Sequence, residues 1–121
     1  MKILVVDDSV TMRKIIVNIL GKSGYKDTVE ATDGKDALSK MYSEKIEFII
    51  TDWNMPEING HDFVKAVRED PAFKDIPILM VTARSMKEDM VAALKVGVTS
   101  YIVKPFEAKE LEEKLDVMFK K

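Results

Sequence analysis

Residues 2–8 read KILVVDD, an apolar run that ends abruptly in two carboxylates, Asp7 and Asp8. Two similar runs follow: residues 48–52 read FIITD and end in Asp52, and residues 101–104 read YIVK and end in Lys104. Short apolar runs rich in β-branched residues are typical of the buried strands of a parallel sheet. The carboxyl ends of such strands share one edge of an open α/β sheet. We therefore expect these four charged side chains to meet in a single pocket.

Strand and helix patterns alternate along the chain. We expect strands over residues 3–6, 28–31, 48–51, 78–81 and 100–103, and helices beginning near Ser9 and Asp33 and covering residues 61–69, 86–96 and 108–119. The side chains of Ser9 and Asp33 can cap helix N-termini. Five strands that alternate with five helices predict an α/β fold, a doubly wound five-stranded parallel sheet with five helices.

The first helix carries its own signals. Its apolar residues at helical spacing predict a buried face made of Ile15, Ile16, Ile19 and Leu20. Gly21 or Gly24 ends the helix, and Gly24 is the better candidate for a left-handed cap.

Composition limits the class of protein. The chain has 121 residues, 46% hydrophobic and 33% charged, which is ordinary for one soluble domain. Its net charge is −2 and its pI is near 5.5, without a dense Lys/Arg tract, so we expect no nucleic-acid partner. The absence of cysteine fits a reducing compartment. No apolar stretch reaches the roughly 20 residues of a membrane span, and from the residues before Asp7 we expect no signal peptide. We expect a cytoplasmic protein that does not bind membranes.

The predicted pocket gathers like charges. Two unit charges about 4 Å apart repel by about 4 kcal/mol at an effective dielectric near 20. Asp7, Asp8 and Asp52 together therefore call for a cation, and Mg²⁺ prefers oxygen ligands. Alone, Asp7 and Asp8 would equally suit a helix cap, because acids favour helix N-termini.

Two further side chains fit the same pocket. Lys104 precedes Pro105, which can fix a turn through a cis bond. Thr82, at the end of residues 78–82 (ILMVT), offers a hydroxyl, although a lone strand-end threonine is usually structural. Carboxylate, magnesium, hydroxyl and ammonium groups together would bind the oxygens of a phosphoryl group, and an aspartate can itself be the nucleophile.

Four motifs in order resemble those of response regulator receiver domains, and most closely those of stand-alone chemotaxis regulators: LVVDDS (4–9), TDWNMPEINGHD (51–62), MVTA (80–83) and YIVKPF (101–106). The resemblance covers essentially the whole chain, 1–121, as a single receiver domain. It implies a flavodoxin-like fold with strand order 2-1-3-4-5.

The resemblance also implies residue roles. Asp52 would accept the phosphoryl group. Asp8, Asp52 and the backbone carbonyl of Asn54 would hold Mg²⁺ directly, and Asp7 would do so through a water. The phosphoryl oxygens would contact Thr82, Ala83 and Lys104, and Thr82 and Tyr101 would form the switch. The matching partner face comprises Ser85, Lys87, Met90, Tyr101, Val103, Phe106 and Lys114.

One position departs from the family pattern. Arg84 lies where the better-known chemotaxis regulator has an acid, and Arg84 and Asn54 would flank the path of the hydrolytic water. We hypothesise that Arg84 tunes the lifetime of the aspartyl phosphate; equal single-turnover hydrolysis rates in Arg84→Glu and the parent would remove the idea.

The implied function is a signalling switch rather than an enzyme. A chemotaxis histidine kinase would supply the phosphoryl group, and the phosphorylated monomer would bind a flagellar motor switch protein, with a phosphatase as a possible third partner. Two alternatives remain open: a phosphorelay intermediate, and an aspartyl-phosphate phosphatase. Such phosphatases usually carry a second Asp two residues after the nucleophile, where this chain has Asn54.

Overall fold

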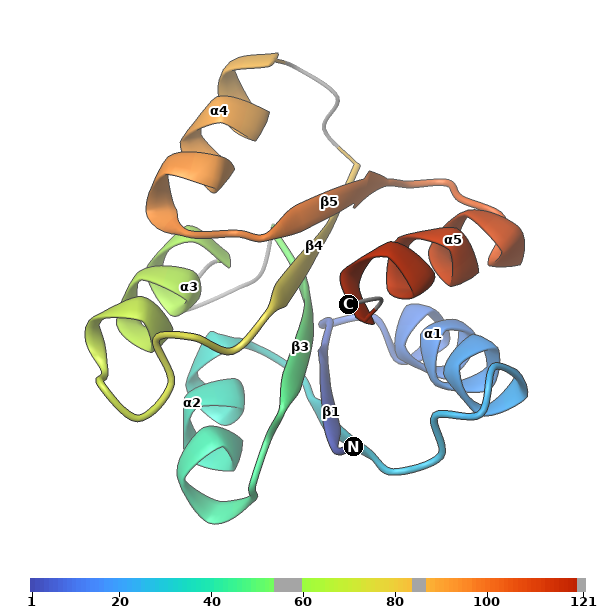
Figure 1. Cartoon of the computed structure of the whole chain (residues 1–121), viewed down its shortest axis with the longest axis horizontal. Coiled ribbons are helices and arrows are strands. Elements are labelled where there is room, and N and C mark those ends of the chain that lie inside the picture. Colours follow the sequence, from blue (N-terminus) through green and yellow to red (C-terminus); the bar gives the residue numbers. More distant parts are fainter. Residues whose placement is uncertain (54–59, 84–86, 120–121) are drawn as a thin grey trace.

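Five parallel strands form the centre of the molecule, a computed structural model in which residues 1–53, 60–83 and 87–119 are described (Figure 1). They are β1 (Ile3–Val6), β2 (Thr28–Ala31), β3 (Phe48–Asp52), β4 (Ile78–Thr82) and β5 (Ser100–Val103). Their order in the sheet is β2-β1-β3-β4-β5, so the predicted flavodoxin-like topology is confirmed. This order places the ends of β1 and β3 side by side at the centre of the sheet.

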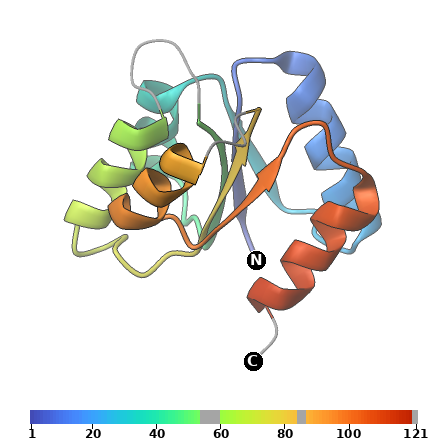
Figure 2. The same cartoon turned by 90° about the horizontal axis from the view of Figure 1, so that it is seen from above.

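Helices cover both faces of the sheet. They are α1 (Val10–Lys22), α2 (Gly34–Ser43), α3 (Gly60–Glu69), α4 (Lys87–Val96) and α5 (Ala108–Phe119). The helices α1 and α5 lie on one face, and α2, α3 and α4 lie on the other (Figures 1 and 2). Among the described residues, no helix has the length and apolar character needed to cross a membrane.

The alternation of side chains along each strand divides the core into two layers. In β1, Leu4 packs in the cluster that contains Phe63 of α3, whereas Ile3 packs in the cluster that contains Leu111 and Leu115 of α5. All four residues of β1 are buried, as expected for a central parallel strand covered on both faces.

The predicted helix signals are confirmed. The hydroxyl of Ser9 accepts a hydrogen bond from the backbone N–H of Met12 at 3.2 Å, and Asp33 accepts one from Asp36 at 2.8 Å. Gly24 follows α1 with φ +96°, and Gly97 follows α4 with φ +118°. Glycine suits both positions because it adopts this left-handed region without a steric penalty.

Three sequence-based expectations need correction. Ile15 is 43% exposed rather than buried. The buried face of α1 passes through Arg13, Ile16, Ile19 and Leu20, and Ile15 lies a helical step of about 100° away from Ile16. In addition, β3 and β4 each extend one residue further than expected, to Asp52 and Thr82. Both polar residues are thus part of the sheet ladder and not of the following loop.

One hydrogen bond between α2 and the end of α3 has a testable pH consequence. The Tyr42 hydroxyl donates to Asp70 Oδ2 at 2.7 Å. This bond, with a second from the backbone N–H of Ala72, lowers the pKa of the Asp70 carboxyl. The same bond raises the pKa of the Tyr42 hydroxyl.

In Tyr42→Phe we expect the pKa of Asp70 to rise toward its ordinary value, while the bond from Ala72 holds it slightly low. A lowered folded-state pKa stabilises the fold above the ordinary carboxyl pKa, and this contribution is lost as the pH falls through the folded value. For Tyr42 the sign is opposite, because its pKa is raised in the folded protein. The bond stabilises the fold below the ordinary phenol pKa, and this stabilisation is lost as the pH rises through the raised pKa of Tyr42. An NMR titration of the Asp70 carboxyl carbon tests this, and an unchanged pKa in the variant contradicts it.

Candidate functional site

Three carboxylates meet at the carboxyl ends of β1 and β3. Oxygen atoms of Asp7, Asp8 and Asp52 all lie within 4.8 Å of one another. Asp7 and Asp52 are buried, with 1% and 6% of their surface exposed, whereas Asp8 faces solvent. The prediction that these residues come together is confirmed, and the edge of the cluster is open to a ligand.

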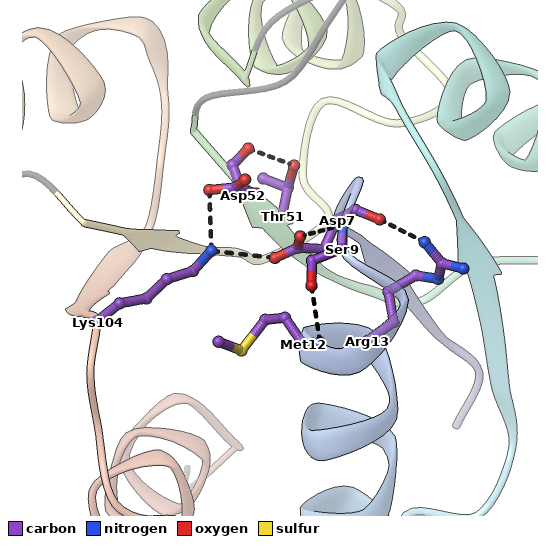
Figure 3. Close-up of polar contacts among 7 residues, drawn as sticks. All are labelled: Asp7, Ser9, Met12, Arg13, Thr51, Asp52 and Lys104. Atoms are coloured by element: carbon purple, nitrogen blue, oxygen red, sulfur yellow. Dashed lines mark hydrogen bonds and ion pairs between the residues drawn. The ribbon is translucent and has the colours of Figure 1, made fainter.

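Lys104 reaches across the sheet edge into this cluster. Its Nζ lies 3.2 Å from Asp7 Oδ2 and 3.5 Å from Asp52 Oδ1 (Figure 3). The Lys104–Pro105 peptide bond is cis, as the sequence suggested. The backbone N–H of Lys104 donates to the carbonyl oxygen of Thr82 at 2.7 Å, which joins the ends of β4 and β5.

Hydrogen bonds hold both the carboxylate and the backbone carbonyl of Asp7. Its Oδ1 accepts a hydrogen bond from the backbone N–H of Ser9 at 2.8 Å. Its backbone carbonyl accepts one from Arg13 Nη1 at 2.7 Å, and Arg13 Nε donates to Glu30 at 3.1 Å. Figure 3 shows the Arg13 guanidinium beside Asp7. Arg13 therefore acts as a positioning residue of the cluster.

Sequence reasoning missed Arg13. A basic residue on an amphipathic helix usually lies on the solvated face. The available signal was its spacing, three residues before Ile16 and seven before Leu20, which places it on the buried face.

The end of β3 and the start of α3 lie close together. Thr51 Oγ1 donates to the carbonyl oxygen of Asp52 at 3.0 Å. The backbone N–H of Trp53 donates to the carbonyl oxygen of Val81 at 3.2 Å, and that of Gly60 donates to the carbonyl oxygen of Trp53 at 2.9 Å. A Cβ on Gly60 would lie 2.7 Å from both the Asp52 carbonyl oxygen and the Trp53 Cα. Glycine at this position lets the start of α3 approach Asp52 closely.

The donor set fits a magnesium ion. Because Mg²⁺ binds oxygen at about 2.1 Å, ligands on opposite sides of the ion are about 4.2 Å apart. The carboxylate oxygens of Asp7, Asp8 and Asp52 lie within 4.8 Å of one another. They can hold one ion if one carboxylate binds it through a water, or if the side chains move slightly. Charge fits as well: three carboxylates and the Lys104 ammonium carry a formal charge of −2, which a divalent cation balances.

The family model for the response regulator receiver domain matches residues 3–116. The chain belongs to this family. It is 53% identical over 119 residues to the chemotaxis protein CheY1 of Helicobacter pylori, a match that covers 98% of this chain and 96% of that protein. It is thus a CheY-type receiver domain.

Solved structures agree with this assignment. The chemotaxis response regulator CheY4 of Vibrio cholerae is 38% identical, with a TM-score of 0.91 and 98% of each chain covered. The receiver domain of a sensor histidine kinase from Pseudomonas aeruginosa is 26% identical, with a TM-score of 0.86 over 96% of this chain and 94% of that one. That structure has a magnesium ion coordinated in its active-site cleft.

The other predicted site residues of this receiver domain are described only in part. Thr82 is buried at the end of β4, directly after Val81, which pairs with Asp52, and Ala83 is exposed beyond it. Tyr101 is half-buried on β5, and the ammonium of Lys114 lies 5.6 Å from the centre of its ring. Asn54, Arg84 and Ser85 lie outside the described residues, as does the side chain of Lys87.

The predicted partner face contains half-buried side chains from three elements. Its described members are Met90, Tyr101, Val103, Phe106 and Lys114. Phe106 is only partly exposed, as expected, and packs against the apolar cluster beneath α5. The described members of the face are mainly apolar or aromatic, and Lys114 is the one charged side chain among them.

Proposed function

We propose that this receiver domain accepts a phosphoryl group on Asp52 from a sensor histidine kinase of the chemotaxis system. In that state it binds the flagellar motor switch and thereby controls rotation. The observation that carries the proposal is the position of the Lys104 ammonium, within 3.5 Å of the Asp52 carboxylate and 3.2 Å of Asp7. The likeness to CheY1 of Helicobacter pylori supports the chemotaxis role.

The transfer step is a substitution at phosphorus. A carboxylate oxygen of Asp52 attacks, an O–P bond forms, and the N–P bond to the kinase histidine breaks, leaving the imidazole with the electron pair. In this proposal Lys104, the Thr82 hydroxyl and the backbone of Ala83 hold the phosphoryl oxygens. Catalysis is then mainly positioning and charge neutralisation.

Magnesium has a defined place in this proposal. Asp8, Asp52 and the backbone carbonyl of Asn54 would be its direct ligands, and Asp7 would act through a water. When bound, the ion supplies positive charge against the phosphoryl oxygens. The negative charge of the cluster and the magnesium in the related Pseudomonas aeruginosa receiver support this assignment.

The output would be a shift between two states. Thr82 would move toward the phosphoryl group and Tyr101 would turn inward, which alters the partner face beside Phe106 and Lys114. The half-buried position of Tyr101 on β5 is compatible with either orientation. Phosphorylation can shift the equilibrium only as far as the phosphoryl group interacts more favourably with one state than with the other.

Binding to the purified flagellar motor switch protein tests this function. We expect Mg²⁺ and beryllofluoride, a phosphoryl mimic, to raise the affinity of the parent by about tenfold, within the usual range of allosteric coupling. Titration calorimetry measures this, with Asp52→Asn as the variant that should not respond. Unchanged affinity, together with rapid transfer of the phosphoryl group to a histidine phosphotransfer protein, would instead establish the phosphorelay alternative.

A further inference from the structure

A groove separate from the Asp52 site runs between α3 and α4. It has a volume of about 550 Å³, and its lining includes His61, Lys65, Arg68 and Glu69 of α3 with Lys95 and Val96 of α4. These helices lie side by side on the face of the sheet opposite α1 and α5 (Figure 2). None of the roles proposed above uses this groove.

The groove is basic in an acidic protein. Lys65, Arg68 and Lys95 against Glu69 give it a formal charge of +2 with His61 neutral, whereas the whole chain carries −2. Lys65 and Lys95 are exposed, and neither forms an ion pair within 4.0 Å with any residue in the described part of the chain. Their charge is therefore available to a ligand.

Arg68 forms a fixed wall of the groove. Its Nε donates to the carbonyl oxygen of Gly97 at 2.8 Å, and its Nη1 donates to that of Ile76 at 2.7 Å. These acceptors are neutral and hold the guanidinium in place, while the nearby Asp75 carboxylate offsets part of its charge. The wall is preorganised, which lowers the cost of ordering on binding.

One end of the groove reaches the neighbourhood of Asp52. The ring of His61 meets that of Trp53 edge-on, with centroids 5.9 Å apart. Trp53 directly follows Asp52 in the chain. An occupant of the groove that contacts His61 would therefore be connected to Asp52 through the side chains of His61 and Trp53.

We propose that the groove between α3 and α4 binds an acidic peptide segment of a partner protein, with its carboxylates on Lys65 and Lys95 and an apolar side chain against Val96. Charge complementarity favours this occupant. A nucleic acid suits the groove less well because the lining includes the apolar side chains of Ala92 and Val96, which a phosphate backbone would not contact favourably. The groove shares helix α4 with the predicted partner face, but none of the residues of that face lines it. The proposal does not require phosphorylation of Asp52.

Fluorescence anisotropy with two matched pairs of charge reversals tests the proposal. The probe is a short fluorescein-labelled peptide of glutamate, aspartate and leucine, without any phosphoryl donor. The groove pair is Lys65→Glu with Lys95→Glu, and the control pair is Lys14→Glu with Lys35→Glu, exposed lysines of α1 and α2. Each pair changes the formal net charge from −2 to −6, so the total charge is matched.

We expect saturable binding to the parent, and the groove pair should lower the affinity about tenfold or more. The control pair should change it by no more than about twofold, because charges beyond a Debye length are largely screened. Equal losses in both pairs would mean non-specific attraction and would overturn the proposal. Absence of binding to the parent would do the same, as would lysine-dependent binding of single-stranded DNA in place of the peptide. No outcome depends on Asp52, so the result is separate from the test of the motor function.

Discussion

Replacing Asp52 with asparagine is expected to abolish acceptance of a phosphoryl group. The amide lacks the anionic oxygen that attacks phosphorus, so no aspartyl phosphate forms. The change also removes one of the three carboxylates around the candidate metal position and one of the two carboxylates near Lys104. Because the negative charge falls, we also expect weaker binding of Mg²⁺.

Intact-mass measurement after incubation with acetyl phosphate and Mg²⁺ tests this. The parent should gain one phosphoryl group that is released by hydroxylamine, as an acyl phosphate is. Asp116→Asn is a matched control, because Asp116 is exposed on α5, away from the sheet edge, and the substitution changes the charge equally. Phosphorylation of Asp52→Asn at the parental level would show that the acceptor is a different residue.

Replacing Gly60 with alanine is expected to destabilise the protein by about 1–3 kcal/mol, the usual effect of overpacking. The added Cβ would lie 2.7 Å from the Asp52 carbonyl oxygen and 2.8 Å from the Trp53 carbonyl oxygen. These are backbone atoms, so no side-chain rotation relieves the contact. The start of α3 or the end of β3 has to move, and the movement occurs next to Asp52, the proposed phosphoacceptor.

Gly21→Ala is the matched control for this substitution. Gly21 lies within α1, its added Cβ would meet nothing within 4 Å, and alanine favours a helix over glycine by about 0.5–1 kcal/mol. Urea unfolding should therefore shift to lower midpoints in Gly60→Ala and to slightly higher ones in Gly21→Ala. A stable Gly60→Ala with unaltered Mg²⁺ affinity would mean that the connection to α3 has more freedom than its contacts indicate.

The fold could be predicted almost completely because its signals are local. The strands are short apolar runs, and helices α1 and α2 begin directly after Ser9 and Asp33, which cap them as expected. The gathering of Asp7, Asp8, Asp52 and Lys104 also followed from the sequence, since every one lies at the carboxyl end of a strand in a parallel sheet.

The remaining features depend on geometry between elements. The burial of Arg13 depends on the Asp7 carbonyl and on Glu30 of β2, which the sequence places far from it. The exposure of Ile15 depends on which side of α1 faces the sheet. The presence of an isoleucine at position 15 does not reveal that side. The basic groove requires α3 and α4 to lie side by side, with Lys65 and Lys95 separated by 30 positions.

The ion pair between Lys104 and Asp7 joins residues 97 positions apart. During synthesis, the amino-terminal strand and all three carboxylates emerge from the ribosome long before the lysine does. Closing so long a loop costs chain entropy, which the docking of β5 beside β4 has to offset. A nascent or carboxy-terminally truncated chain thus contains the proposed acceptor, Asp52, but lacks the ammonium beside it. In the proposed function, a chain without β5 and Lys104 would therefore lack one of the groups that hold the phosphoryl oxygens.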